Sequence, residues 1–266
     1  MPIEYGVELN FTGQEQFHAV DRQVMRHAFD IHNTLGRFCD ERVYQDELAQ
    51  RCRMGGFELH REVLLRVSYE GFSKPYYLDM LLDRGVIYEL KAVDVLNGNH
   101  QKQLIHYLLL TGLCHGKLVN FRPGSVESRF VSTRLRRQDR SAFRLAGDEW
   151  CGDDKPSRLL RETLCELLAD WGAFLDVNLY REALLHFLGG PDHGVQPIEI
   201  VVSGRVVGTQ KMCILTDGTA WHLSSVRQHL KSYETHLRRL LSHTRLDRIQ
   251  WINLDQRIVM LKTLNK

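Results

Sequence analysis

The sequence predicts an α/β protein with two similar halves, each with the element order α-α-β-β-β-α-β. The spacing of apolar residues changes from three or four to two and back along residues 14–121, and residues 156–254 repeat this succession. With 266 residues, 43% hydrophobic and 26% charged, the composition excludes the disordered, collagen-like and disulfide-scaffold classes. We expect domains over residues 1–135 and 156–266, joined by a basic and polar linker over residues 136–155.

Two amphipathic helices are expected first. One covers Gln14–Leu35, and the other covers Glu41–Arg53. Their apolar stripes have helical spacing and consist of Phe17, Val20, Val24, Ala28, Ile31 and Leu35 in the first, and Tyr44, Leu48 and Cys52 in the second. Glycine ends each helix, at Gly36 and at Gly55-Gly56.

A three-stranded antiparallel meander follows, because short β-rich runs are separated by Glu70-Gly71 and by Asp83-Arg84-Gly85. The expected strands are Glu62–Tyr69, Tyr76–Leu82 and Val86–Val93. A helix over Asn99–Thr111 and a buried strand over Lys117–Phe121 complete the half, with Phe130–Leu135 a candidate for one more strand.

The second half aligns with the first in two long gapless blocks. Gly36, Phe38, Tyr44 and Leu48 match residues 136 positions later, and Leu104, Leu108, Thr111, Leu113 and Asn120 match residues 133 positions later. Helical periodicity runs from Ser157 towards Leu188, as a repeat requires. We therefore interpret the chain as a tandem duplication.

Charge and targeting signals are unremarkable. The formal charge of +2 gives no global field typical of a nucleic-acid or membrane binder, although seven arginines lie between Arg122 and Arg144. No apolar run reaches about 18 residues, and the N-terminus has no signal-peptide pattern, so we expect a cytoplasmic protein. The six cysteines have no metal-ligand spacing and are expected to be reduced.

The expected hairpin places two carboxylates together. A three-residue loop centred on Arg84, with glycine in the left-handed position, pairs Asp79 with Glu89. Strand alternation then directs Asp79, Glu89 and Lys91 to one face and Leu90 to the core. Carboxylates in such positions repel one another unless a cation lies between them, and oxygen ligands suit Mg²⁺ or Mn²⁺.

Two helices contribute further candidates, because Glu41 and Tyr44 share one helix face and Gln103 and Tyr107 share another. Both faces are expected to look towards the strand site. The structural alternatives are a solvated polar face for Gln103 and Tyr107 and a helix-dipole contact for Glu41.

Taken together, these residues resemble a known family. From about His27 to Phe121 the chain is similar to the GxxExxY proteins, a branch of the PD-(D/E)XK nuclease superfamily with a restriction-endonuclease-like core. The family signature falls on Phe38, Glu41 and Tyr44, with Phe38 in place of glycine. The remaining motif positions are Asp79, the triplet Glu89-Leu90-Lys91, and the helix pair Gln103 and Tyr107, which resembles that of recombination-type exonucleases.

The resemblance implies metal-dependent hydrolysis of phosphodiester bonds, with DNA as the favoured substrate. Asp79, Glu89, the Leu90 carbonyl and Glu41 would hold Mg²⁺ or Mn²⁺. Lys91 would position a water and stabilise the transition state, and Gln103 and Tyr107 would orient these groups. A non-enzymatic nucleic-acid-binding or protein-interaction module and an RNA nuclease are the alternatives.

The second half lacks every member of this constellation. A two-residue loop at Asp217-Gly218 predicts that Cys213 pairs with His222, so that they replace Asp79 and Glu89. Ser224, Val177, His236 and Leu240 then replace Lys91, Glu41, Gln103 and Tyr107. We expect a catalytically inactive repeat that contacts a nucleic-acid strand, docks a protein partner or only buries a face of the first half.

Overall fold

A computed structural model describes residues 3–266 as two compact units, Met1–Arg137 and Gln138–Lys266. The first unit contains β1 (Ile3–Tyr5), α1 (Gln14–Leu35), α2 (Glu41–Met54), β2 (Leu59–Tyr69), β3 (Phe72–Leu82), β4 (Val86–Lys91), α3 (Gly98–Thr111), β5 (His115–Asn120) and β6 (Glu127–Ser132). A short helix, α4 (Arg137–Arg140), crosses the boundary between the units.

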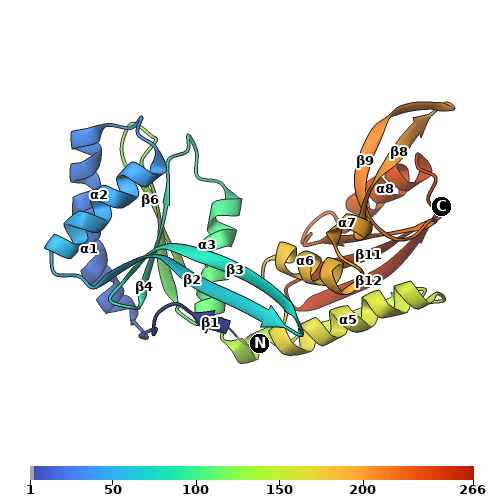
Figure 1. Cartoon of the computed structure of the whole chain (residues 1–266), viewed down its shortest axis with the longest axis horizontal. Coiled ribbons are helices and arrows are strands. Elements are labelled where there is room, and N and C mark those ends of the chain that lie inside the picture. Colours follow the sequence, from blue (N-terminus) through green and yellow to red (C-terminus); the bar gives the residue numbers. More distant parts are fainter. Residues whose placement is uncertain (1–2) are drawn as a thin grey trace. The chain divides into compact units, whose positions relative to one another are not determined.

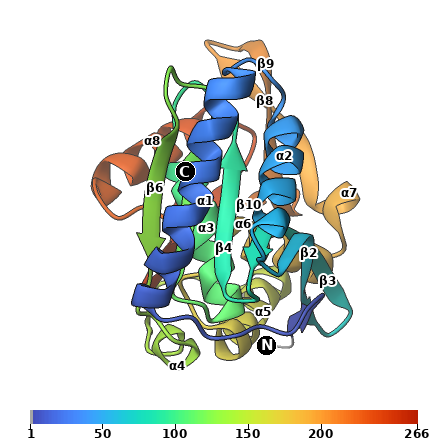
Figure 2. The same ribbon diagram turned by 90° about the vertical axis from the view of Figure 1, so that its left-hand side faces the viewer.

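The first unit is a six-stranded mixed sheet between helices, with strand order β1-β2-β3-β4-β5-β6. Among the strands of this sheet that the structure describes, only β4 and β5 pair in parallel, and α3 connects them. Figures 1 and 2 show α1 and α2 over one face of the sheet and α3 over the other. The α-α-β-β-β-α-β order expected from the sequence is therefore confirmed, and β1 and β6 add the outer strands.

The core of the first unit forms from the predicted helix stripes. The α1 residues Phe17, Val24, Ala28 and Ile31 are buried, while Leu35 at the helix end is exposed. They pack with the α2 stripe against the strand residues Met80, Leu82, Val86, Tyr88 and Leu90. Leu90 thus faces α1 and α2, so that Glu89 and Lys91 on either side of it face α3.

The β3–β4 hairpin has the expected register but a different turn. Leu82 pairs with Val86, as a loop centred on Arg84 requires. The left-handed conformation belongs to Asp83 and Arg84, with φ of 47° and 59°, rather than to Gly85. Gly85 is required for another reason: a Cβ there would collide with the side chain of Thr12.

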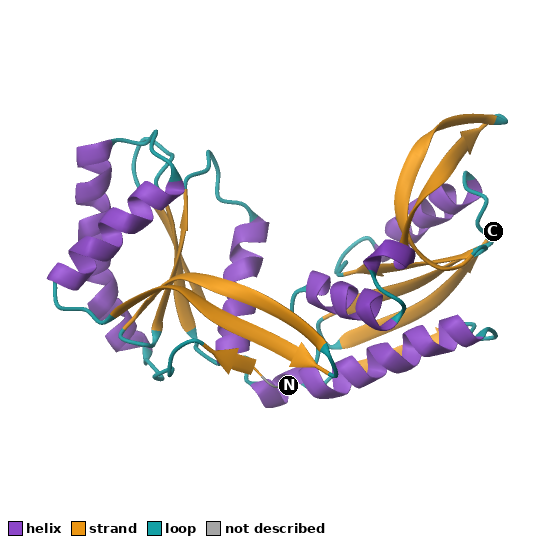
Figure 3. Ribbon diagram, in the orientation of Figure 1, coloured by secondary structure: helices purple, strands orange, loops and turns teal. Residues whose placement is uncertain are grey.

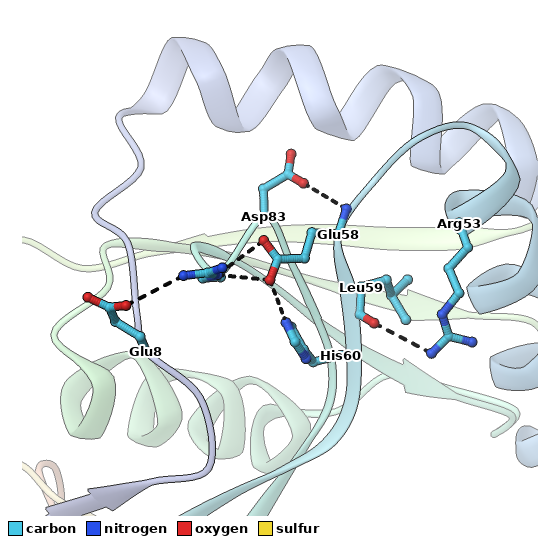
Figure 4. Close-up of polar contacts among 7 residues, drawn as sticks. Glu8, Arg53, Glu58, Leu59, His60 and Asp83 are labelled. Carbon is cyan, nitrogen blue, oxygen red and sulfur yellow. Dashed lines mark hydrogen bonds and ion pairs between the residues drawn. The ribbon is translucent and has the colours of Figure 1, made fainter.

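Polar contacts pin this turn to the start of β2. The Asp83 carboxylate accepts from the backbone N–H of Glu58 at 3.2 Å, and Arg84 Nε donates to Glu58 Oε1 at 2.8 Å. His60 lies 3.0 Å from the Glu58 carboxylate, as Figure 4 shows. Arg84 also contacts Glu8. These contacts with Glu58 and Glu8 therefore stabilise the left-handed conformation of Asp83 and Arg84.

The second unit is also a six-stranded mixed sheet, with strand order β7-β12-β11-β10-β9-β8. Figure 3 shows its strands in orange and its helices in purple. Its elements are β7 (Arg144–Glu149), α5 (Lys155–Trp171), α6 (Val177–Phe187), α7 (Pro191–Gly194), β8 (Val195–Val202), β9 (Arg205–Thr216), β10 (Thr219–Ser224), α8 (Leu230–Ser242), β11 (Arg248–Asp255) and β12 (Ile258–Asn265). Residues 136–155, expected to be a linker, instead contain α4 and β7, and β7 pairs with β12 inside this sheet.

The two sheets share their strand pairing from β2 to β6 and from β8 to β12. In each set the first two pairs are antiparallel, the third is parallel and the fourth is antiparallel. The sixth strand lies on opposite edges: β1 beside β2 in the first unit, and β7 beside β12 in the second.

Matching hydrogen bonds also recur at the aligned positions. Tyr44 Oη donates to the Gly36 carbonyl at 2.8 Å, and Tyr180 Oη donates to that of Gly172 at 2.5 Å. Asn120 bonds both backbone groups of Val93 at 3.0 and 2.7 Å. The corresponding pair, Asn253 and Val226, makes the same two bonds at 2.7 and 2.9 Å. These bonds fix the turn before the second helix and the end of the central strand in both units.

None of the helices in residues 3–266 is long and apolar enough to cross a membrane.

Candidate active site

The site lies where β3 separates from β4. Regular pairing between these strands ends at Met80 and Tyr88, and the next residues in register are Asp79 and Glu89. Beyond that point the Asp79 carboxylate replaces the missing backbone partner, since it accepts from the Leu90 N–H at 2.8 Å. The predicted opposition of Asp79 and Glu89 follows directly from this register.

Lys91 lies between the two carboxylates. Its Nζ is 2.7 Å from Glu89 Oε1 and 3.9 Å from Asp79 Oδ2, and the side chain is only 13% exposed. Burial lowers the pKa of Lys91, but the charges of Glu89 and Asp79 outweigh burial and raise this pKa overall. Lys91 is therefore a fixed cation at neutral pH.

Glu89 is a buried carboxylate with an unsatisfied oxygen. Its side chain is 1% exposed, and Oε2 has no hydrogen-bond partner within residues 3–266. Burial, followed by the charge of Asp79, raises the pKa of Glu89 to about 8. Burial likewise raises the pKa of Asp79, and Glu41 and Glu62 contribute in the same direction. An unpaired oxygen in this position costs free energy that a bound cation would recover.

Helix α3 contributes a hydrogen-bonded pair of side chains, Gln103 and Tyr107. Its capping box at Asn97 fixes where the helix begins. Gln103 Nε2 donates to Tyr107 Oη at 3.1 Å. Tyr107 is buried, and burial together with the charge of Glu89 raises its pKa to about 12, so that the phenol stays protonated. Because the charges of Glu89 and Asp79 both act on the Tyr107 phenol, we expect the pair to face these carboxylates.

Glu41 reaches the site from the other side. It is the first residue of α2, accepts a hydrogen bond from Gln45 at 3.3 Å, and contributes to the raised pKa values of Asp79 and Glu89. The carboxylates of Glu41 and Asp79 open into a cleft of about 610 Å³. Its remaining lining residues are Asp40, Arg42, Gln45, Glu62 and Tyr77.

Tyr44 does not join the site, although the sequence places it on the face of Glu41. Its hydroxyl donates to the Gly36 carbonyl and accepts from the Cys39 N–H at 3.1 Å. Its ring stacks on Phe121 with centroids 4.5 Å apart. Tyr44 therefore shapes the turn before α2 rather than the chemistry at the strands.

Glu62 is a candidate that the sequence argument missed. The β2–β3 register pairs Arg61 with Met80 and Val63 with Leu78, which places Glu62 opposite Asp79. The two-residue turn at Glu70-Gly71 carried this signal, because counting back from it gives the same partner. Glu62 also has a left-handed φ of 48° inside a strand, where its carboxylate lines the cleft.

The donor set suits a hard divalent cation. Lys91 O accepts from Phe121 N on the β5 side, so alternation turns the Leu90 carbonyl to the β3 side, where Asp79 lies. Asp79, Glu89 and this carbonyl offer only oxygen ligands, which Mg²⁺ and Mn²⁺ prefer. Within residues 3–266 no three His, Cys, Asp or Glu side chains converge closely enough to hold a metal by themselves.

In the second unit, the β9–β10 hairpin differs from the pairing that the sequence predicts. A bulge after Thr219 shifts the hairpin, so that Cys213 pairs with Trp221 and Met212 is opposite His222. The expected pairing of Cys213 with His222 is therefore wrong, and alternation places them on opposite faces of the sheet. His222 Nε2 instead lies 2.7 Å from Tyr233 Oη.

Other positions of the second unit follow the alignment. Val177 begins α6 as Glu41 begins α2, and His236 and Leu240 lie on α8. Ser224 Oγ accepts from Trp251 Nε1 at 2.9 Å. No carboxylate occupies a position of the strand site in this unit.

Comparison with known proteins agrees with the geometry of the first unit. Residues 18–132 match the family described as the PD-(D/E)XK nuclease superfamily. The matched segment contains Asp79, Glu89, Lys91 and both helix contributions. No curated protein and no solved structure matches the chain. The match supports a nuclease-type phosphodiester hydrolase with nucleic acid as the bound partner.

Proposed function

We propose that the first unit is a metal-dependent nuclease of the GxxExxY type that hydrolyses phosphodiester bonds in DNA. The observation that carries this proposal is the buried, unpartnered Oε2 of Glu89 beside Asp79. Glu89 is buried beside the half-buried Asp79, and the single positive charge of Lys91 does not neutralise both carboxylates, so a bound cation would recover the remaining cost.

Mg²⁺ or Mn²⁺ would be held by Asp79, Glu89 and the Leu90 carbonyl, with Glu41 on the cleft side. A metal there would lower the pKa of a bound water and would neutralise charge on the scissile phosphate. Lys91 holds the attacking water and stabilises the pentavalent transition state with its fixed charge. The Gln103–Tyr107 pair orients these groups from helix α3, since the hydrogen bond between Gln103 and Tyr107 restricts the movement of both side chains.

The Gln103 and Tyr107 spacing resembles that of recombination-type exonucleases and favours exonuclease action, and DNA is the favoured substrate. The hydrogen bond between the two side chains supports their acting as one unit.

We also propose that the second unit arose by duplication and is catalytically inactive. The shared strand pairing and the recurring Tyr44/Tyr180 and Asn120/Asn253 bonds support common descent. The absence of carboxylates at its strand site supports inactivity.

Cleavage of labelled single- and double-stranded DNA and RNA in Mg²⁺, Mn²⁺ or chelator tests the proposal. The wild type is compared with a Glu89→Ala, Lys91→Ala double variant. A Glu15→Ala, Lys102→Ala double variant is the control, because it removes the same charges from exposed helix positions.

Metal-dependent cleavage that is lost only in the site variant supports the nuclease and identifies its substrate. Cleavage that persists in the site variant refutes the assignment. Equal binding without cleavage by all three proteins favours a non-enzymatic binding module.

A further inference from the structure

Tyr77 is an exposed aromatic residue in the wall of the cleft. It lies on β3, two residues before Asp79, and both residues line the same volume of about 610 Å³. Tyr77 is 52% exposed. Within residues 3–266 its ring contacts no other ring and its hydroxyl has no hydrogen-bond partner. The fold of the first unit therefore does not use the aromatic character of Tyr77.

The neighbouring Tyr76 shows the contrast, because its ring packs on the opposite face of β3. Its centroid lies 4.8 Å from that of His106 and 6.2 Å from that of Tyr107, both on α3. Alternation along the strand turns Tyr77 away from α3. On that side the cleft is also lined by Glu41 of α2. Tyr77 thus faces the open cleft rather than the core.

The other cleft residues make the cleft acidic. They comprise four carboxylates, one amide and one guanidinium: Asp40, Glu41, Glu62, Asp79, Gln45 and Arg42. The guanidinium of Arg42 already lies 4.0 Å from the carboxylate of Glu62. Because carboxylates repel phosphate, a nucleic-acid strand needs a contact here that does not depend on its backbone charge. An aromatic ring provides one, since every base has a face that can stack on it.

The spacing of Tyr77 and Asp79 suits one nucleotide. Two residues of a strand span about 6.6 Å, which is comparable to the separation between a base and the phosphate of its own nucleotide. A base stacked on Tyr77 therefore brings the adjoining phosphate to Asp79. Only a base outside a duplex stack can offer its face to the ring, so the arrangement favours an unpaired strand.

The second unit lacks this ring where it lacks the carboxylates. Met212 lies opposite His222 as Asp79 lies opposite Glu89. Two residues before Met212, the position of Tyr77 is taken by Gln210, whose Nε2 donates to the Lys211 carbonyl at 3.2 Å. The ring and the carboxylates are present together in one unit and absent together from the other, as expected if both serve one substrate.

We propose that Tyr77 is the stacking surface for a base of single-stranded DNA, and that it places the adjoining phosphate at Asp79. This inference rests on the nuclease function proposed for the first unit and specifies its substrate. Unpaired strands and unpaired ends bind in the cleft, whereas the paired interior of a duplex does not.

Binding of a single-stranded oligonucleotide that contains 2-aminopurine tests the proposal, because the fluorescence of this base reports stacking. The full chain is measured in Mg²⁺ with Lys91→Ala as the common background, which separates binding from cleavage. Tyr77→Ala removes the ring and Tyr77→Phe retains it. Phe29→Ala is the matched control, since Phe29 is 44% exposed on α1, which contributes no residue to the cleft.

Tyr77→Ala is expected to weaken binding of the single strand roughly tenfold and to abolish the fluorescence change. Tyr77→Phe and Phe29→Ala are expected to bind as the background protein does. The same oligonucleotide annealed to its complement should bind more weakly and be insensitive to Tyr77→Ala. Urea unfolding followed by circular dichroism verifies that each variant is folded.

The proposal is overturned if Tyr77→Ala binds the single strand as Phe29→Ala does, or if Tyr77→Phe binds as weakly as Tyr77→Ala. It is also overturned if the duplex binds as tightly as the single strand and depends equally on Tyr77. A chain with Lys91 intact that cleaves nothing, while the fluorescence change still requires Tyr77, supports the stacking site and refutes the nuclease alone.

Discussion

The unpaired carboxylate of Glu89 makes a quantitative prediction about pH and stability. The pKa of this group is about 8 in the folded protein and 4.5 when unperturbed. Between these values the folded state holds a proton that the unfolded state releases, so stability falls as the pH rises from 4.5 to 8. At about 1.36 kcal/mol per pH unit, the loss is roughly 5 kcal/mol.

Glu89→Gln isolates this effect, because glutamine is similar in size to the protonated acid and keeps an oxygen for Lys91. In chelator, the free energy of unfolding is measured by urea denaturation with circular dichroism from about pH 5 to about pH 9. We expect the variant and the wild type to be equally stable at the acid end. The variant should become more stable by several kcal/mol at the alkaline end.

Tryptophan fluorescence provides an internal control, since all four tryptophans of the chain lie in the second unit. The transition that they report should be the same in both proteins at every pH. A stability difference that stays constant with pH, or one that appears equally in the tryptophan signal, would refute the reasoning. The residues concerned are Trp150, Trp171, Trp221 and Trp251.

Four further outcomes are expected. Mg²⁺ at about 100 times its Kd should stabilise the wild type by about 2.7 kcal/mol in thermal melts and leave Glu89→Gln unchanged; equal stabilisation would exclude a site at Glu89. Lys91→Ala should lose cleavage and keep oligonucleotide binding in gel-shift assays; residual cleavage near the wild-type rate would contradict the role of Lys91. Tyr44→Phe should cost about 1 kcal/mol in urea unfolding through the lost bond to Gly36 and leave metal affinity unchanged by calorimetry. Asn97→Ala should cost about 1 kcal/mol by removing the α3 cap, and an unchanged urea midpoint would argue against that cap.

Local rules predicted the central hairpin well. Helix stripes and turn residues act over a few positions, so the register of Leu82 with Val86 followed from the loop length alone. The opposition of Asp79 and Glu89 follows from that register and needed no knowledge of the rest of the fold.

Features that depend on residues far apart in the sequence could not be predicted from local patterns. The turn at Asp217-Gly218 does pair Thr216 with Thr219, as a two-residue loop requires, but the bulge beyond it moves Cys213 to Trp221. A bulge adds a residue to one strand without any turn signal. Pairing of β1 with β2 and of β7 with β12 likewise depends on contacts remote in sequence.

Tyr44 shows a different limit. Helical spacing correctly gives the face on which a side chain lies, but not the direction in which a long ring extends. The hydroxyl of Tyr44 donates to the Gly36 carbonyl, so Tyr44, three positions after Glu41, stabilises the turn rather than the site. The recurrence of this bond at Tyr180, where no acid is present, agrees with a structural role.

The contrast between the two strand sites locates the chemistry. In the second unit, Ser224, at the position aligned with Lys91, donates to Asn253 at 2.7 Å and accepts from Trp251. In the first unit, Glu89 keeps an oxygen without a partner. Proteins violate polar satisfaction chiefly at functional sites, where a ligand completes the bonds. The second unit has no carboxylate at the aligned positions Met212 and His222, which is expected if the unpaired oxygen of Glu89 serves the cation proposed for the first unit.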